Sequence, residues 1–211
     1  MGNTTVTKIV TPEQKKVLDY LTNADKGCGS HNMTDQEFLA HVEKLISGLK
    51  LKDRAIKKLG IDLDQVSEIE PVYFEGFKFV SSIAKQTESG LWVSNIVQAS
   101  WIFFSVDQIF IYTYEMHLDE DKKRENTIEY FYRDVTSFVT NTHDEKTKFV
   151  YTRERSGCQS KTQQEKEKVV ETTEFRITVP GDTMELAMKD SEDNEERIQG
   201  MKQLLREKKN K

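Results

Sequence analysis

The residue types that most often do chemistry are few in this chain and widely spaced. Its four histidines are His31, His41, His117 and His143, a spacing that does not match a set of metal ligands. His117 is followed by Asp119, Glu120 and Asp121, the only grouping in the sequence that could invite a cation. Oxygen-rich cation loops need a turn glycine and a fixed ligand spacing, which this run lacks. We therefore predict no metal site and interpret the run as a solvated hairpin tip.

Catalytic signatures are also missing from the sequence. It has no nucleophile elbow, phosphate-binding loop, dinucleotide-binding glycine pattern or His-Glu-x-x-His motif. Two carboxylate pairs, Glu68 with Glu70 and Glu171 with Glu174, are the candidates for general acid and base catalysis. With 32% charged residues, however, this chain has carboxylates that are more typical of solvated faces. We predict no catalytic residues and no cofactor, and a non-catalytic protein is favoured over an enzyme.

Charge and composition argue against several classes of partner. The net charge is −5 and lysine and arginine are spread along the chain, so no strong field attracts a nucleic acid. No stretch approaches the 18 apolar residues of a membrane span, and no secretion signal is recognisable, so we expect a cytoplasmic protein that does not insert into membranes. The isolated Cys28 and Cys158 predict free thiols.

The first third of the chain carries helix signals. After a flexible tail over 1–10, Thr11 with Gln14 and Thr34 with Glu37 form two capping boxes, and Gly60 predicts the end of a third helix over Asp53–Leu59. One face of the second helix is apolar over Phe38, Leu39, Val42, Leu45, Ile46 and Leu49. We expect this face to pack on the first helix or on the sheet region. The predicted helical region is 11–61, followed by a linker over 62–71.

The rest of the chain has a composition typical of β-structure, because 18 of its 20 aromatic residues lie between Tyr73 and Phe175. The predicted strands are 72–80, 92–104, 108–118, 127–133, 135–142, 147–154, 169–179 and 183–189, and 127–142 also fits one bent strand. Short connections, among them a turn at Pro180-Gly181, predict antiparallel pairing throughout.

A last helix is predicted to start at Asp190 or Ser191. Its apolar stripe consists of Ile198, Met201, Leu204 and Leu205, and such a stripe must dock on another part of the protein. We expect it to cover one end of the sheet region and to contact strand aromatics such as Trp101 or Phe103.

About seven antiparallel strands followed by one amphipathic helix resemble the pleckstrin-homology (PH-like) superfold over about residues 72–209. The segment Tyr130–Phe138, a strand, an Asp-Val pair and a second strand, is similar to a pattern of PH-like and GRAM-type domains. The helical region resembles no family. The expected fold is therefore α+β: a small N-terminal helical region, then an antiparallel PH-like β-barrel over 72–211 capped by the C-terminal helix.

The resemblance implies a module that binds a protein or a lipid head group. Lipid-binding members carry a basic cluster around the first hairpin, which here would be Val80–Trp92 and holds one lysine and one glutamate. We therefore expect no phosphoinositide binding. The predicted function is a non-catalytic intracellular module that binds another protein through a sheet edge or the groove beside the last helix. The candidate partner or lid surface comprises Ile198, Met201, Leu205, Phe38, Val42 and Leu45.

Two alternatives remain open from the sequence. The β-barrel could instead enclose a small apolar ligand, or the protein could be an enzyme that uses this interior. A homo-oligomer is also compatible with the sequence, and exposure of both Val42 and Leu45 would favour it.

Overall fold

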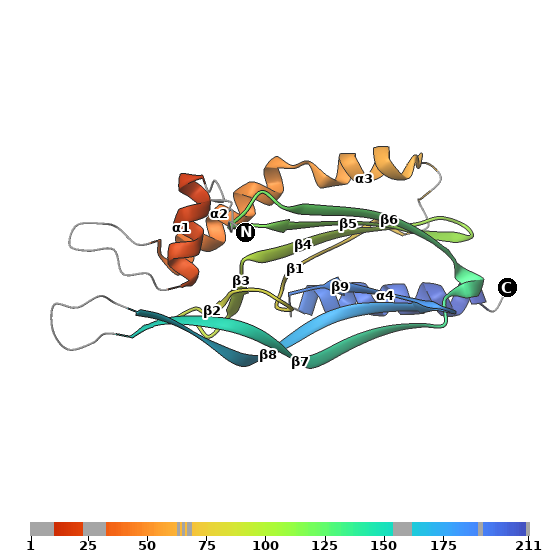
Figure 1. Ribbon diagram of the computed structural model, residues 1–211. Helices are drawn as coiled ribbons and strands as arrows, with labels where there is room; N and C mark the ends of the chain where they lie inside the picture. Colours follow the sequence, from red (N-terminus) through yellow and green to blue (C-terminus); the bar gives the residue numbers. More distant parts are fainter. Residues whose placement is uncertain are drawn as a thin grey trace, which may run out of the picture.

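The computed structural model describes residues 11–22, 33–62, 64, 66, 69–153, 162–189 and 192–209. These residues form three layers, with helices over one face of a four-stranded sheet and a three-stranded sheet on its other face (Figure 1). The fold is thus α+β with antiparallel sheets and a C-terminal helix. None of the helices in this described part is long and apolar enough to cross a membrane.

The four-stranded sheet has the order β1-β4-β5-β6 and the three-stranded sheet the order β7-β8-β9. Their bounds are β1 Val72–Lys78, β4 Ile96–Phe104, β5 Gln108–His117, β6 Lys123–Phe131, β7 Ser137–Arg153, β8 Thr162–Val179 and β9 Asp182–Ala187. A small hairpin of β2 (Ala84–Gln86) and β3 (Trp92–Ser94) is inserted after β1. In the described residues the two larger sheets are not hydrogen-bonded into one closed barrel, so the expected barrel is not confirmed.

Every pair of strands in the three sheets is antiparallel, as the short connections predicted. One isolated parallel bridge joins Ile83, just before β2, to Lys148 in β7. The turn between β8 and β9 has Gly181 at a φ of 86°, which agrees with the turn predicted at Pro180-Gly181.

Several strand bounds differ from the prediction. The segment 92–104 is interrupted at Asn95, whose side chain accepts a hydrogen bond from the backbone of Ile83 at 2.8 Å. A short 3₁₀ turn, η2 (Tyr132–Asp134), separates β6 from β7, so 127–142 is not one strand. The charged segments 123–126 and 162–168 are strand, because their neighbours β5 and β7 supply ladder partners that composition does not reveal.

The predicted helices are present as α1 (Pro12–Leu21), α2 (Asp35–Gly48) and α3 (Leu51–Leu59), and both capping boxes are confirmed. The third helix starts two residues earlier than predicted, and Gly60 ends it at a φ of 64°. The apolar face of α2 packs on both expected partners: the Phe38 ring lies 4.6 Å from that of Tyr20 in α1 and 6.1 Å from that of Phe77 in β1.

The four-stranded sheet separates two hydrophobic cores, since successive side chains of a strand point to opposite faces. The core under helices α1–α3 includes Phe38, Phe77, Phe103 and Tyr112, with Trp101 packed against it. The core between the sheets includes Phe74, Ile102, Phe104 and Phe175.

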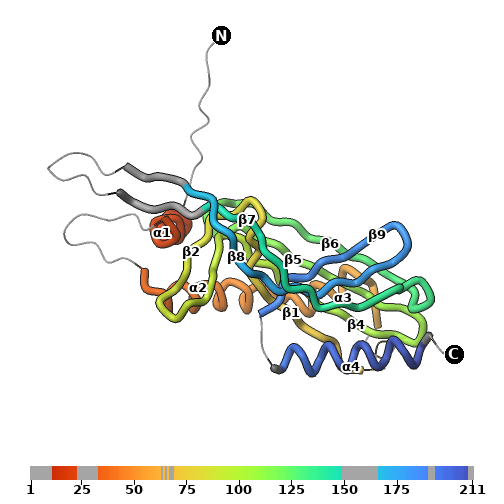
Figure 2. The backbone as a smooth tube through the Cα atoms, turned by 90° about the horizontal axis from the view of Figure 1, so that it is seen from below, coloured from red at the N-terminus to blue at the C-terminus, as the bar shows by residue number. Residues whose placement is uncertain are grey.

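Helix α4 (Glu192–Lys209) contributes Ile198, Met201, Leu204 and Leu205 to the core between the sheets, which confirms that its stripe is buried. It lies along one long side of the molecule (Figure 2). The expected contact with Trp101 or Phe103 was wrong, because both side chains face the helical layer on the other side of the sheet. The predicted cap residues Asp190 and Ser191 lie outside the described residues.

Candidate functional sites

The structure places most of the predicted partner or lid surface in the interior. The side chains of Ile198, Met201 and Leu205 are buried in the core between the sheets, and those of Phe38 and Val42 under the helical layer. Leu45 is 39% exposed. Because Val42 is buried, the joint exposure of Val42 and Leu45 that would favour a homo-oligomer is not observed. The buried members of this set belong to the two hydrophobic cores.

The chemical groupings suggested by the sequence either lie apart in the structure or contact neighbouring side chains. At the tip between β5 and β6, His117 lies 3.1 Å from Glu120, and Asp119 accepts a 2.8 Å hydrogen bond from Asn95. Glu171 is exposed while Glu174 is buried on the opposite face of β8, so these two carboxylates do not form a pair. The predictions for His31, Cys28, Cys158 and Glu68 concern residues outside the described part.

Two carboxylates join the helical layer to the sheet. Glu125 in β6 accepts a short hydrogen bond from the Tyr112 hydroxyl and pairs with Arg54 and Lys58 of α3, both at 2.9 Å. Burial acts to raise the pKa of Glu125, but the Tyr112 hydrogen bond and the two cations outweigh it and hold this pKa below its ordinary value.

The second of these carboxylates is Asp35 of α2. It accepts 2.7 Å hydrogen bonds from the Tyr20 hydroxyl and from the backbone of Glu88. The Lys85 ammonium lies 3.8 Å from the Asp35 carboxylate and 3.8 Å from the Tyr20 ring centroid. The lysine of the first hairpin is therefore engaged in holding the helices to the sheet.

A groove of about 520 Å³ opens where the β4–β5 turn, η2 and the end of α4 meet. It is lined by Val106, Asp107, Phe131, Tyr132, Arg133 and Lys208. Val106 and Phe131 are 61% and 42% exposed, so two exposed apolar side chains share this hollow. The Arg133 guanidinium lies over the Phe131 ring at 4.9 Å from its centroid, and the Lys208 ammonium over the Tyr132 ring at 5.8 Å.

The groove adjoins the outer edge of β6. This strand is the last in the order β1-β4-β5-β6, and it has no ladder partner on its outer side among the described residues. The opposite edge strand, β1, is covered: Lys189 donates a backbone hydrogen bond to Glu75, and Arg197 of α4 donates to the carbonyl of Tyr73. The β6 edge thus offers backbone donors and acceptors next to an exposed aromatic ring.

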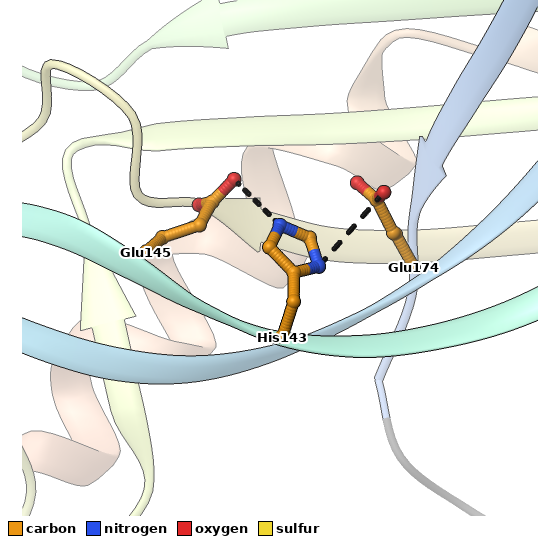
Figure 3. Close-up of side chains that lie close together, drawn as sticks. All are labelled: His143, Glu145 and Glu174. Atoms are coloured by element: carbon orange, nitrogen blue, oxygen red, sulfur yellow. Dashed lines mark ion pairs between the residues drawn. The ribbon is translucent and has the colours of Figure 1, made fainter.

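A third grouping lies on the β7–β8 hairpin. His143 and Glu145 alternate along β7 and so share a face, and Glu174 reaches the same face because it pairs with Asn141 in the ladder. Figure 3 shows the imidazole between the two carboxylates. The His143 Nε2 atom is 3.4 Å from a Glu145 oxygen, and the Nδ1 atom is 4.0 Å from a Glu174 oxygen.

This grouping was missed from the sequence because Glu174 is distant from His143 along the chain. The alternation of Asn141, His143 and Glu145 was the available signal, since polar residues at every second position of a strand share a face. Both glutamates are largely withdrawn from solvent, with side chains 15% exposed at Glu145 and 11% at Glu174.

Comparisons with models of protein families, with curated proteins and with solved structures found no match to this chain. The basis for a functional conclusion is therefore the chemistry of the surfaces described above.

Proposed function

We propose that this protein is a non-catalytic, PH-like interaction module whose partner is another protein. The support from architecture is the order of the elements: a four-stranded antiparallel sheet, a three-stranded antiparallel sheet and then α4. This order resembles the PH-like superfold, with the β2–β3 hairpin and helices α1–α3 as additions. Modules of that kind usually act by binding.

The observation that carries the proposal is the groove at the end of β6, with Phe131 and Val106 exposed beside an unpaired strand edge in the described part of the chain. Aromatic and arginine side chains supply a large part of the binding energy at protein interfaces. Here Arg133 and Phe131 are already stacked, so little side-chain entropy is lost when a partner covers them.

The occupant we propose is an extended segment of another protein that adds a strand along the outer edge of β6. Strand addition gives affinity through backbone hydrogen bonds and specificity through pockets for side chains. The groove offers Phe131 and Val106 to an apolar side chain. Its lining holds two cations, Arg133 and Lys208, against one acid, Asp107, and Arg133 also lies 3.9 Å from Asp134. These cations favour a segment that carries a carboxylate.

The interior supports a binding module over a ligand-enclosing barrel. In the described part of the chain, the core between the sheets is made of buried side chains, among them Phe74, Phe104 and Phe175. The Phe175 ring centroid lies 5.4 Å from that of Phe74 and 5.5 Å from that of Phe138, which is ordinary core packing.

A displayed library of random peptides tests the proposal directly, since such a selection does not require a named partner. Selection on the wild-type protein should enrich peptides that combine an apolar residue with Asp or Glu. Binding of synthetic versions to Phe131→Ala and Arg133→Ala should weaken at least about tenfold, as expected when a central anchor is truncated.

The matched control is Val139→Ala, a variant of a residue that is also 42% exposed but lies on β7 away from the groove. It should bind the selected peptides as the wild type does. Peptides that bind all three variants equally, or no enrichment at all, would contradict the proposed groove. Self-association that is lost in Phe131→Ala would show that the occupant is a second copy of this chain.

A further inference from the structure

We propose that His143, Glu145 and Glu174 bind one zinc ion on the β7–β8 hairpin. This site is separate from the groove and does not depend on the proposed function. All three side chains come from paired strands, β7 and β8, which hold them more rigidly than a loop would. They converge on one side of the hairpin (Figure 3).

The distances suit an ion. One ligand atom from each of the three residues lies within 4.8 Å of the other two, so an ion at their centre would be at most about 2.8 Å from each of these atoms. Zinc binds nitrogen and oxygen at about 2.0 to 2.2 Å, and the site therefore needs a contraction of about 0.7 Å per ligand. The His143–Glu145 separation of 3.4 Å already equals the spacing of about 3.4 Å between two tetrahedral zinc ligands.

A simple ion pair accounts less well for this geometry. A charge-assisted hydrogen bond from imidazole to carboxylate would be about 2.7 to 2.9 Å long, whereas the separations are 3.4 and 4.0 Å. The side chain of Glu145 is only 15% exposed. Among the described residues, its carboxylate pairs with His143 at this long separation of 3.4 Å. A carboxylate withdrawn from water is costly unless it is paired or coordinates a metal.

The neighbours of the cluster are those expected around a bound metal. Asn141 lies 3.2 Å from Nδ1 of His143, a contact that can fix the orientation of the ring. Arg176 donates to Glu174 at 2.8 Å and also pairs with Glu185 at 2.8 Å. This bridging arginine fixes the orientation of the Glu174 carboxylate.

The donor set narrows the choice of metal. One imidazole nitrogen with carboxylate oxygens favours zinc over magnesium and calcium, which prefer oxygen ligands only. Three protein ligands leave a fourth position for water. Because the ligands come from both strands, the ion would cross-link β7 to β8 within the long hairpin.

The test is a titration of chelator-treated full-length protein with Zn²⁺, followed by calorimetry and by the melting temperature. Wild type should bind one ion at this site and melt at a higher temperature with zinc. His143→Gln and Glu145→Gln should each weaken binding at least about tenfold. The visible spectrum of bound Co²⁺ should show tetrahedral coordination that these variants lose.

Asp144→Asn is the matched control, because Asp144 is exposed on the opposite face of the same strand. It should keep the affinity and the Co²⁺ spectrum of the wild type. Glu145→Gln is preferred to a variant of Glu174, since it leaves the Glu174–Arg176 pair intact and the apoprotein folded. Zinc binding that survives in both ligand variants, no zinc binding in wild type, or a preference for Mg²⁺ or Ca²⁺ would overturn the proposal.

Discussion

Replacement of Gly76 by alanine should destabilise the fold, because at this position β1 passes unusually close to the chain that follows β9. A Cβ atom on residue 76 would lie 2.7 Å from the backbone nitrogen of Met188 and 2.9 Å from the carbonyl carbon of Ala187. Both atoms belong to the backbone, so the clash cannot be relieved by a side-chain rotation. One of the two segments has to move.

The cost can be estimated from the contacts that this movement strains. Overpacking of a tight site costs about 1 to 3 kcal/mol. The same movement weakens the 2.9 Å hydrogen bond from Lys189 to Glu75 and the 2.7 Å one from the Ala187 backbone to Gln98, at about 1 kcal/mol for each bond lost. Alanine also lowers the conformational entropy of the unfolded chain, which stabilises the folded state by about 0.4 to 1 kcal/mol. We expect a net loss of about 2 kcal/mol.

For a chain of 211 residues this loss corresponds to a fall in the melting temperature of about 4 to 8 °C. Thermal unfolding followed by circular dichroism measures it. The control is Gly200→Ala in α4, where an added Cβ meets nothing within 4 Å and better helix propensity should stabilise by about 1 kcal/mol. A Gly76→Ala protein that melts at or above the wild-type temperature would refute the close approach of β1 to the segment before α4.

Two further variants test the layers on either side of the four-stranded sheet. Met201 is fully buried between the sheets, so Met201→Ala should lower the free energy of unfolding in urea by about 2 to 5 kcal/mol. Replacement of the exposed Gln199 by alanine should be nearly neutral. Equal effects of the two variants would show that α4 is not docked. Glu125→Gln should cost about 1 to 3 kcal/mol at pH 7. Since the pKa of Glu125 is held below its ordinary value of 4.5, its contribution is present above that pH and is lost as the pH falls through the lowered pKa. Between pH 7 and pH 3, the free energy of unfolding should therefore fall less in Glu125→Gln than in the wild type or in Glu129→Gln. Equal falls in all three proteins would contradict this reasoning.

The sequence by itself determined the features that depend on neighbours along the chain. The two capping boxes need only residues three apart, and Thr11 and Thr34 begin their helices as predicted. The turn at Gly181 and the short connections required antiparallel pairing. The apolar stripe of α4 predicted that this face of the helix is buried, and the Met201 side chain on it is fully buried.

Which face each strand presents was decided only by the tertiary structure. Trp101 and Phe103 point to the helical layer, while Ile102 and Phe104 point to the core between the sheets. A sheet face is fixed by register, and a shift of one residue exchanges the two faces. Whether two sheets close into a barrel likewise depends on pairing between distant strands, which composition does not encode.

Neither candidate site could be assembled in full from the sequence. The groove assembles Val106, Phe131 and Lys208 from three separate elements. The proposed zinc site unites His143 with Glu174 only because Asn141 pairs with Glu174 in the β7–β8 ladder. Local patterns specify helices, turns and strands through short-range hydrogen bonds and periodicity, whereas sites made from distant segments exist only once packing and strand register are set.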